Sequence, residues 1–409
     1  MALDGTAGLL SSGWAAHLHA TRLLLREDRA GAAPWTATLT QPVTLDLTRD
    51  AQTLDLRTGA WHVVLAGAAS GQPRLDADPL HFRLQGQGYT LSSKGRLADV
   101  PLSWLDALSN HALSGNSLAG DMVLAGQWDA QLDQGLHLTA TLARSRGDLV
   151  VLGGSAGTGA RMAAGVRDAR LTLQGSGNAL HAALHWDSAN AGTADLQLAT
   201  RLVSQSGGWS LPGTAPVQGT IRADLPQLGI WSMFAPPGWR LRGTLQARAT
   251  VGGTLQSPTL QGTLNADELG VRSVVDGIEF NHGTLRTRLS GNRLDIDTFT
   301  LQGAPQQGQS GGSLRISGNL QWGDGGQPLL HTLRAQLATH LDRLQLSTLS
   351  DRQIVLSGDM QTQLAALRLT MRGALRVDHA YFVLPTDTAP SLDDDAIVLP
   401  STRHPRAPH

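Results

Sequence analysis

Hydrophobic and polar residues alternate with a period of two along most of the chain. Leu-Asp-Leu at 45–47 and Leu-His-Leu-Thr at 136–139 are typical of this pattern, which recurs as far as residue 372. Such alternation places apolar side chains on one face of a β-strand and polar side chains on the other. Gly, Asn and Asp interrupt the runs at roughly 8–12 residue intervals, as in antiparallel meanders. The pattern therefore predicts a mostly β protein.

Leucine fills most of the apolar positions, and aromatic residues make up only 4% of the chain. Packed β cores are usually rich in Val, Ile and aromatic rings. Two interpretations follow: an ordinary sandwich or solenoid core, or a curved sheet whose apolar face stays open for an apolar ligand. For the second interpretation, the candidate groove-lining residues are Leu136, Leu138, Leu171, Leu173, Leu196, Leu198, Leu285, Leu289, Leu294, Ile296, Leu314, Ile316, Leu367 and Leu369.

Three short segments depart from the alternation and are predicted to be helices, at 101–108, 225–234 and 341–349. Each is followed by a strand that opens with Leu-x-Gly, and the glycines of these openings are Gly120, Gly243 and Gly358. A recurring order of helix, Leu-x-Gly strand and meander predicts an elongated array of stacked units. If roughly 30 strands formed one unbroken sheet, it would reach about 140 Å.

Composition removes several functional classes. The formal net charge is −1, so no large basic field attracts a nucleic-acid backbone. The lack of cysteine excludes a disulfide framework, a cysteine-ligated metal and thiol catalysis. Gly308, Ser310 and Gly312 have the spacing of a nucleophile elbow, but a strand pattern follows them instead of the helix that this elbow requires. We expect no enzymatic activity, no cofactor and no bound metal.

The order of several motifs resembles the beginning of the TamB C-terminal domain, in the wider AsmA-like group of bacterial envelope proteins. These motifs are the segment 225–234, the strand 241–245, the Gly/Thr-rich run 251–264, the meander 270–283, the segment 294–303, the strand 373–378, Leu384-Pro385 and the acidic stretch 392–395. The resemblance is good over 219–399 and looser, at AsmA level, over 1–218. It suggests a division into an AsmA-like segment at 1–96, a repeat unit at 97–222, the start of the TamB C-terminal domain at 223–400 and a disordered tail at 401–409.

The resemblance implies an elongated antiparallel β-sheet curved into a hydrophobic groove (a β-taco), with a few short helices along it. Such a protein is expected in the periplasm, where it shields phospholipid acyl chains on their way between the inner and outer membranes. It is also expected to assist outer-membrane protein assembly with a TamA-type β-barrel partner. We expect the inner-membrane anchor to lie outside this chain, since no run approaches the roughly 18–20 apolar residues of a membrane helix. We also expect the outer-membrane-proximal end to lie outside it, since residues 401–409 have no strand pattern.

One alternative remains open, a non-catalytic β-solenoid with a structural or secreted (autotransporter-like) role. It predicts a coil repeat of about 20–25 residues with stacked Asn or Thr ladders, which the sequence does not display. A carbohydrate-binding module is less compatible, because such modules need clustered aromatic residues.

Overall fold

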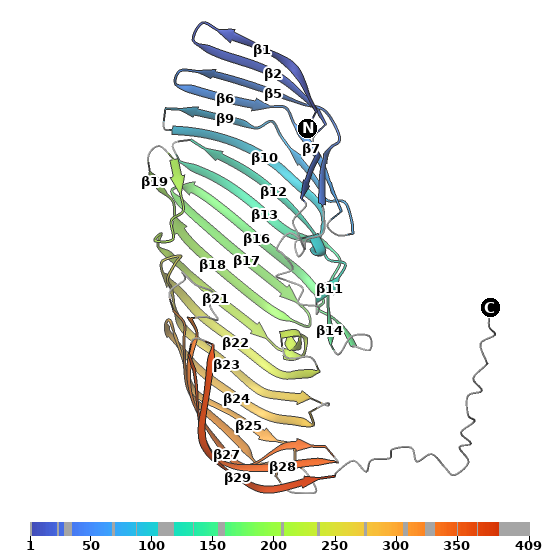
Figure 1. Cartoon of the computed structure of the whole chain (residues 1–409), viewed down its shortest axis with the longest axis vertical. Helices are drawn as coiled ribbons and strands as arrows, with labels where there is room; N and C mark the ends of the chain where they lie inside the picture. Colours follow the sequence, from blue (N-terminus) through green and yellow to red (C-terminus); the bar gives the residue numbers. More distant parts are fainter. Residues whose placement is uncertain are drawn as a thin grey trace, which may run out of the picture.

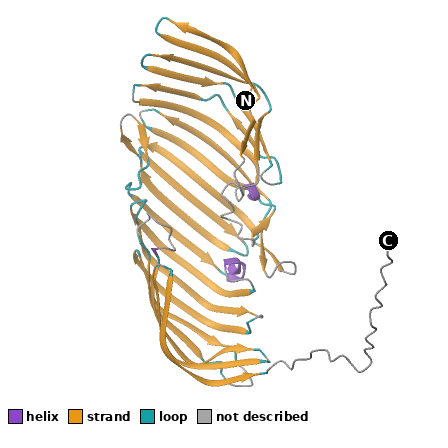
Figure 2. Cartoon of the chain, in the orientation of Figure 1, coloured by secondary structure: helices purple, strands orange, loops and turns teal. Residues whose placement is uncertain are grey.

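β-Strands dominate the structure and cross its long axis obliquely from the N-terminal to the C-terminal end (Figure 1, Figure 2). This computed structural model describes residues 2–383, except for 23, 28–34, 68–69, 87, 105–117, 134, 154–159, 206–207, 235–237, 274–275, 306–309, 324–331, 350 and 366. Strands make up 79% of it, and the large antiparallel sheet is open, with the curvature of a groove. The predicted fold class is therefore confirmed.

A single antiparallel ladder of twenty strands runs the length of the molecule, and we call it the main wall. Each strand of this wall pairs with the next one along the axis. From the N-terminal end, the strands are β1 (Ala2–Leu10), β2 (Gly13–Arg22), β5 (Val43–Asp50), β6 (Thr53–Thr58), β9 (His81–Gln85), β10 (Gly88–Pro101), β12 (Val123–Leu132), β13 (Leu136–Arg146), β16 (Val166–Gly177), β17 (Ala179–Ser188), β18 (Gly192–Arg201), β21 (Val217–Leu225), β22 (Trp239–Gly253), β23 (Pro258–Ser273), β24 (Ile278–Gly291), β25 (Arg293–Gly303), β26 (Ser313–Gln321), β27 (Arg334–Thr348), β28 (Arg352–Ala365) and β29 (Arg368–Phe382).

Shorter elements form a second wall, which we call the side wall. Its N-terminal part is a ladder of β3 (Leu24–Glu27), β4 (Trp35–Leu39), β7 (Trp61–Ala66) and β8 (Arg74–Ala77). Further along lie the three-stranded sheet β11 (Leu118–Gly120), β14 (Leu149–Gly153) and β15 (Ala160–Ala163), and the 3₁₀ helix η1 (Leu228–Phe234). A separate small hairpin consists of β19 (Val203–Gln205) and β20 (Gly208–Ser210).

The two walls meet along a bend that the chain crosses repeatedly. β10 shows the branching directly, because its first half pairs with β9 through Gly88–Ser92 and its second half pairs with β8 through Gly95–Ala98. From β22 onward the bend lies within long strands, where the register shifts between Ala266 and Leu269 and between Leu341 and Leu344. Such shifts are β-bulges, which bend a strand sharply.

Left-handed backbone conformations concentrate at this bend. The residues Asp99, Glu268, His282 and Arg343 have φ between 45° and 53°, and each lies at or beside a register shift. Gly243 has φ of 114°, and an added Cβ would lie 2.7 Å from the carbonyl oxygen of Asp267 on the next strand. Because residues with a side chain rarely adopt this conformation, glycine is needed at position 243, where β22 passes through the bend.

The glycines of the three Leu-x-Gly openings all have a positive φ, although Gly120 lies in β11 of the side wall and Gly243 and Gly358 lie in the main-wall strands β22 and β28. Gly120 and Gly358 have φ of 142° and 140°, and Gly243 has φ of 114°. The recurrence seen in the sequence is therefore a recurrence in backbone conformation. The main sheet continues across two of the domain boundaries predicted from the sequence. β10 contains the boundary between residues 96 and 97, and β21 contains the boundary between residues 222 and 223.

The helix predictions have mixed outcomes. The second is confirmed as η1, and the first is seen only as a helical turn at 102–104, since 105–108 lie outside the described residues. The third is wrong, because 341–348 belongs to β27. The bulge at Arg343 inserts extra residues between Leu341 and Leu344, which imitates the i, i+3 spacing of a helix in the sequence.

The predicted length of about 140 Å is also wrong. The structure has 29 strands in its described part, but only the twenty of the main wall succeed one another along the axis. Nineteen steps of about 4.8 Å give about 91 Å. The remaining strands lie beside the main wall and add depth to the groove instead of length.

Two aspartates connect three consecutive crossings of the bend. The backbone N–H of Asp148 donates to Asp121 Oδ1 (2.8 Å), and the Asp148 carboxylate accepts N–H groups from Leu149, Gly165 and Val166 (2.8–2.9 Å). Burial alone would raise the pKa of Asp148, but these three N–H groups outweigh it and hold the pKa below the ordinary 3.8. The charged carboxylate therefore stabilises this part of the bend.

We expect Asp148→Ala to lower the free energy of unfolding by about 1–3 kcal/mol, because three backbone donors lose their acceptor. Urea titration followed by circular dichroism measures the change. Asp129→Ala is the matched control, since the Asp129 carboxylate is exposed and pairs only with Lys94 (3.2 Å) in the described part; its effect should stay within about 0.5 kcal/mol. Equal losses in the two variants would contradict the role assigned to Asp148.

The same carboxylate predicts a pH dependence of stability. Because its pKa is lower in the folded state, the unfolded chain binds the proton more tightly, and stability rises with pH. The contribution of Asp148 is present above pH 3.8 and is lost as the pH falls through the lower pKa of the folded state. The difference in unfolding free energy between the wild type and Asp148→Ala should therefore shrink below pH 3.8. A constant difference from pH 7 to pH 3 would contradict this.

Candidate functional site

One row of side chains crosses thirteen successive strands of the main wall without a polar member. Each residue is directly opposite the next in the antiparallel register, so all lie on one face of the sheet. We call this set the apolar row. Its members are Leu142, Leu171, Leu184, Leu196, Ile221, Ala249, Gly262, Leu289, Leu294, Leu320, Ala335, Leu364 and Leu369.

The structure brings the predicted lining residues together on this face. Leu171, Leu196, Leu289, Leu294 and Leu369 belong to the apolar row itself. Each of the others lies an even number of residues from a row member on its own strand, which places it on the same face. Strand pairing agrees with this, because Leu285 is opposite Phe299 and Phe299 is opposite Ile316. This second group is Leu136, Leu138, Leu173, Leu198, Leu285, Ile296, Leu314 and Ile316.

Leu367 is placed differently from the other predicted lining residues. It lies in the tight turn between β28 and β29 with φ of 61° and is 57% exposed. In the sequence, Leu367 and Leu369 continue one alternating run. The turn is not apparent there because Ala366 and Leu367 are not typical turn residues.

Charged side chains occupy the opposite face. In β22, Arg240, Arg242 and Arg248 are exposed, while the intervening Leu241 and Leu245 are half-buried. Ion pairs join neighbouring strands on this face, such as Arg288 with Asp297 (2.9 Å) and His340 with Asp359 (2.8 Å). The sheet therefore has a polar outer surface and an apolar inner surface.

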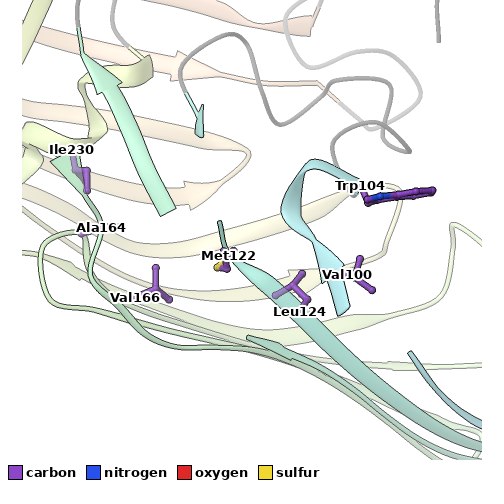
Figure 3. Close-up of a cluster of buried hydrophobic side chains, with 8 residues drawn as sticks. Val100, Trp104, Met122, Leu124, Ala164, Val166 and Ile230 are labelled. Atoms are coloured by element: carbon purple, nitrogen blue, oxygen red, sulfur yellow. The ribbon is translucent and has the colours of Figure 1, made fainter. Parts of the chain in front are cut away.

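Near the bend, the protein's own side chains fill part of the inner surface. The largest buried cluster combines Val100, Trp104, Met122, Leu124, Ala164, Val166, Ala191 and Ile230, and the half-buried residues packed against it include Trp35 and Leu149 of the side wall. Figure 3 shows Val100, Met122, Leu124 and Val166 side by side, with Trp104 at one end and Ile230 at the other. The two walls are held together by this bend cluster.

Away from the bend the inner face is only partly covered. Leu171 and Leu184 oppose each other in the apolar row, and they are 39% and 41% exposed. At the C-terminal end, Leu369, Met371, Leu375 and Val377 of β29 are also exposed. The groove therefore has a packed bottom at the bend and an open apolar wall above it.

Sequence reasoning missed Leu184 and the bend cluster. Residues 180–186 read Leu-His-Ala-Ala-Leu-His-Trp, where apolar Ala183 breaks the alternation. The pairing of β17 with β16 places Leu184 opposite the predicted Leu171, so hairpin pairing was the signal that could have found it. Trp231 of η1 packs against the cluster as well.

These features define an elongated, open β-groove protein with an apolar inner face. Residues 302–408 match the family model described as the TamB C-terminal domain. The match supports assignment of the chain to the TamB-like envelope proteins and confirms the resemblance noted in the sequence. The matched range includes β26 to β29 and begins within the predicted segment 223–400.

No curated protein and no solved structure matches the chain significantly. Within the described ranges, no helix has the length and apolar character needed to cross a bilayer.

An open inner face predicts reagent access to the apolar row. The wild type lacks cysteine, so Leu184→Cys in lipid-free protein should react with a water-soluble maleimide at a rate close to that of Gln197→Cys on the outer face. Leu344→Cys should react more than about tenfold more slowly, because Leu344 is 1% exposed and reaction there requires local opening. Protection of Leu184→Cys to the level of Leu344→Cys would show that the face is filled.

Proposed function

We propose that this protein is a TamB-like bridge in the periplasm that shields lipid acyl chains in its groove during phospholipid transport between the inner and outer membranes. The observation that carries the proposal is the apolar row, which continues over thirteen strands with no polar side chain. At about 4.8 Å per strand, the row extends over about 58 Å.

The energetics favour hydrocarbon as the cargo. Exposing a lipid tail to water costs about 0.8 kcal/mol for each CH₂, so moving two ordinary chains through water costs tens of kcal/mol. An apolar surface that continues from strand to strand removes most of this cost at every position. A uniform aliphatic lining also creates no deep local minimum, which suits movement along the axis.

The same lining favours weak headgroup selectivity. No member of the apolar row can donate a hydrogen bond or offer a charge from its side chain to a phosphate. Burying a charged headgroup against such a surface would be costly. The headgroup is therefore expected to remain in water at the groove opening, while the tails lie against the sheet.

The wider role rests on the family match. We infer a non-catalytic function in outer-membrane biogenesis and protein assembly, with a TamA-type β-barrel protein as the partner at the outer membrane. Attachment to the inner membrane would be provided by a segment outside this chain. The family match supports an envelope location and agrees with these roles without testing them.

The β-solenoid alternative has less support. All strand pairs of the described sheets are antiparallel hairpin-type ladders, with neighbouring strands usually consecutive in sequence. A solenoid instead stacks equivalent strands of successive coils in a repeating register.

A charge placed on the inner face should block lipid binding. We expect Leu196→Arg to reduce the lipid that co-purifies with the protein at least about fivefold, because an arginine there must stay hydrated and keeps water in the groove. Native mass spectrometry of protein extracted from membranes with a mild detergent measures the bound lipid.

Gln197→Arg is the matched control, because it introduces the same charge at the next residue, which is exposed on the outer face. Its lipid content should remain within about twofold of the wild type. Circular dichroism verifies that both variants are folded. If the two variants retain equal amounts of lipid, or if the wild type carries none, the proposed function is wrong.

A further inference from the structure

The last four strands, β26 to β29, have an excess of positive charge. The described residues between 313 and 382 include seven arginines and four aspartates, whereas the whole chain has a formal net charge of −1. Each of these aspartates already has a basic partner at 2.8–3.8 Å; the pairs are Asp342 with Arg343, Asp351 with Arg352, Asp359 with His340 and Asp378 with Arg376. The arginines left without a carboxylate among the described residues are Arg315, Arg334, Arg368 and Arg372.

All four of these arginines are exposed on the outer face of the sheet, and we call them the arginine patch. Arg315 and Arg372 line one open depression of about 540 Å³, in which the other charged residues, His340 and Asp359, are paired with each other (2.8 Å). The outer-face positions between the four arginines carry neutral residues, which are Gln336, Ala338, Gln361, Gln363, Ala365 and Thr370. The described part of the protein therefore does not neutralise the patch.

The end strand β29 combines this charge with exposed hydrocarbon. It is the last strand at the C-terminal end of the sheet, and among the described strands it pairs only with β28 (Figure 1). Its inner-face side chains Leu369, Met371 and Leu375 are 46–60% exposed. Arg368 and Arg372 lie on the opposite face of the same strand, because successive side chains alternate between faces. Cationic and apolar side chains thus reach solvent from the two sides of one strand.

These two features restrict the partner that fits. Guanidinium groups bind phosphate and carboxylate oxygens well, so the partner is anionic. An acidic protein surface would neutralise the arginines but would leave the apolar side chains of β29 in water. A bilayer interface offers phosphates and hydrocarbon within about 5–10 Å of each other. This distance is comparable to the thickness of one sheet with its side chains, about 10 Å.

We propose that the arginine patch and the edge of β29 dock on the surface of an anionic phospholipid bilayer. Arg368 and Arg372 contact lipid phosphates, while Met371 reaches the boundary of the acyl chains. Arg334 and Arg315 lie two and three strands behind β29 and add an attraction that decays over the Debye length, about 8 Å at physiological ionic strength.

The docked position has a consequence for the groove, which rests on the proposed function. The apolar row ends at Leu369 in β29, so docking brings the end of the row next to the hydrocarbon of the bilayer. A lipid tail could then move from the bilayer onto the sheet without crossing water, where exposure costs about 0.8 kcal/mol for each CH₂.

Flotation of the full chain with lipid vesicles tests the docking. The wild type should bind vesicles of equal parts phosphatidylcholine and phosphatidylglycerol, and it should not bind pure phosphatidylcholine. The net charge of −1 provides no overall attraction to these vesicles. We therefore expect Arg368→Gln/Arg372→Gln to lower the partition coefficient about tenfold or more.

Arg222→Gln/Arg248→Gln is the matched control for this pair. It also removes two exposed outer-face arginines that have no ion pair among the described residues. These arginines lie at least seven ladders from β29, far beyond a Debye length of about 8 Å, so binding should stay within about twofold of the wild type. Circular dichroism verifies that all variants are folded.

Met371→Ser/Leu375→Ser tests the apolar contact without changing the charge. We expect the partition coefficient to fall at least about fivefold, because less hydrocarbon enters the interface. Unchanged binding of this variant would show that the contact is only electrostatic, which favours an acidic macromolecule as the partner and overturns the inference. Equal binding by the two arginine variants would also overturn it. So would failure of the wild type to bind the anionic vesicles, as expected if residues 384–409 cover this edge.

The lipid that co-purifies with the protein, measured by native mass spectrometry, separates this inference from the proposed function. Protein that retains lipid but does not dock on anionic vesicles would contradict the docking surface alone. Protein that docks but never carries lipid would contradict the proposed function alone.

Discussion

The register of the antiparallel backbone ladder is the constraint on which this structure depends. Side chains alternate between faces with a period of two, so a slip of one residue in any ladder would move leucines to the outer face and arginines to the inner face. Twelve consecutive ladders keep the apolar row in phase from β13 to β29. Continuity of the groove is thus a property of backbone pairing, and no single residue of the row creates it.

The bend imposes a second requirement, because a flat sheet offers an apolar face but no enclosed space. Bulges at residues such as Glu268 and Arg343 bend the strands where the two walls meet. The bend also determines where the protein packs against itself. Large buried rings such as Trp104 lie there, whereas Leu171 and Leu184, farther from the bend, stay partly exposed. Division into a packed bottom and an open wall follows from this geometry.

Sequence reasoning recovers the parts of this design that depend on local pattern. The alternation of apolar and polar residues identified the strands. Thirteen of the fourteen proposed lining residues share one face of the sheet, because a period of two fixes the face of each side chain within its strand. The alternation gave a wrong prediction at 341–349, where the bulge at Arg343 interrupts the period. It also did not reveal the turn at Leu367, which is formed by residues that are not typical of turns. The side wall and the bend cluster depend on contacts between distant segments such as Trp35, Trp104 and Trp186, which no local pattern records.

A protein with this architecture buries few hydrophobic side chains in a core and leaves an apolar surface that a ligand can cover. Only 21 hydrophobic residues are buried in the described part of a 409-residue chain, so the inner face of the sheet leaves much of its apolar area in contact with water. Backbone ladders and the bend cluster maintain the fold, and the remaining hydrophobic free energy is realised only when something apolar covers the wall. A ligand that binds the folded sheet but not the unfolded chain stabilises the sheet by mass action. Incomplete burial and the proposed shielding of acyl chains are therefore two aspects of one arrangement: the apolar area that folding leaves exposed is the area that a lipid tail would cover.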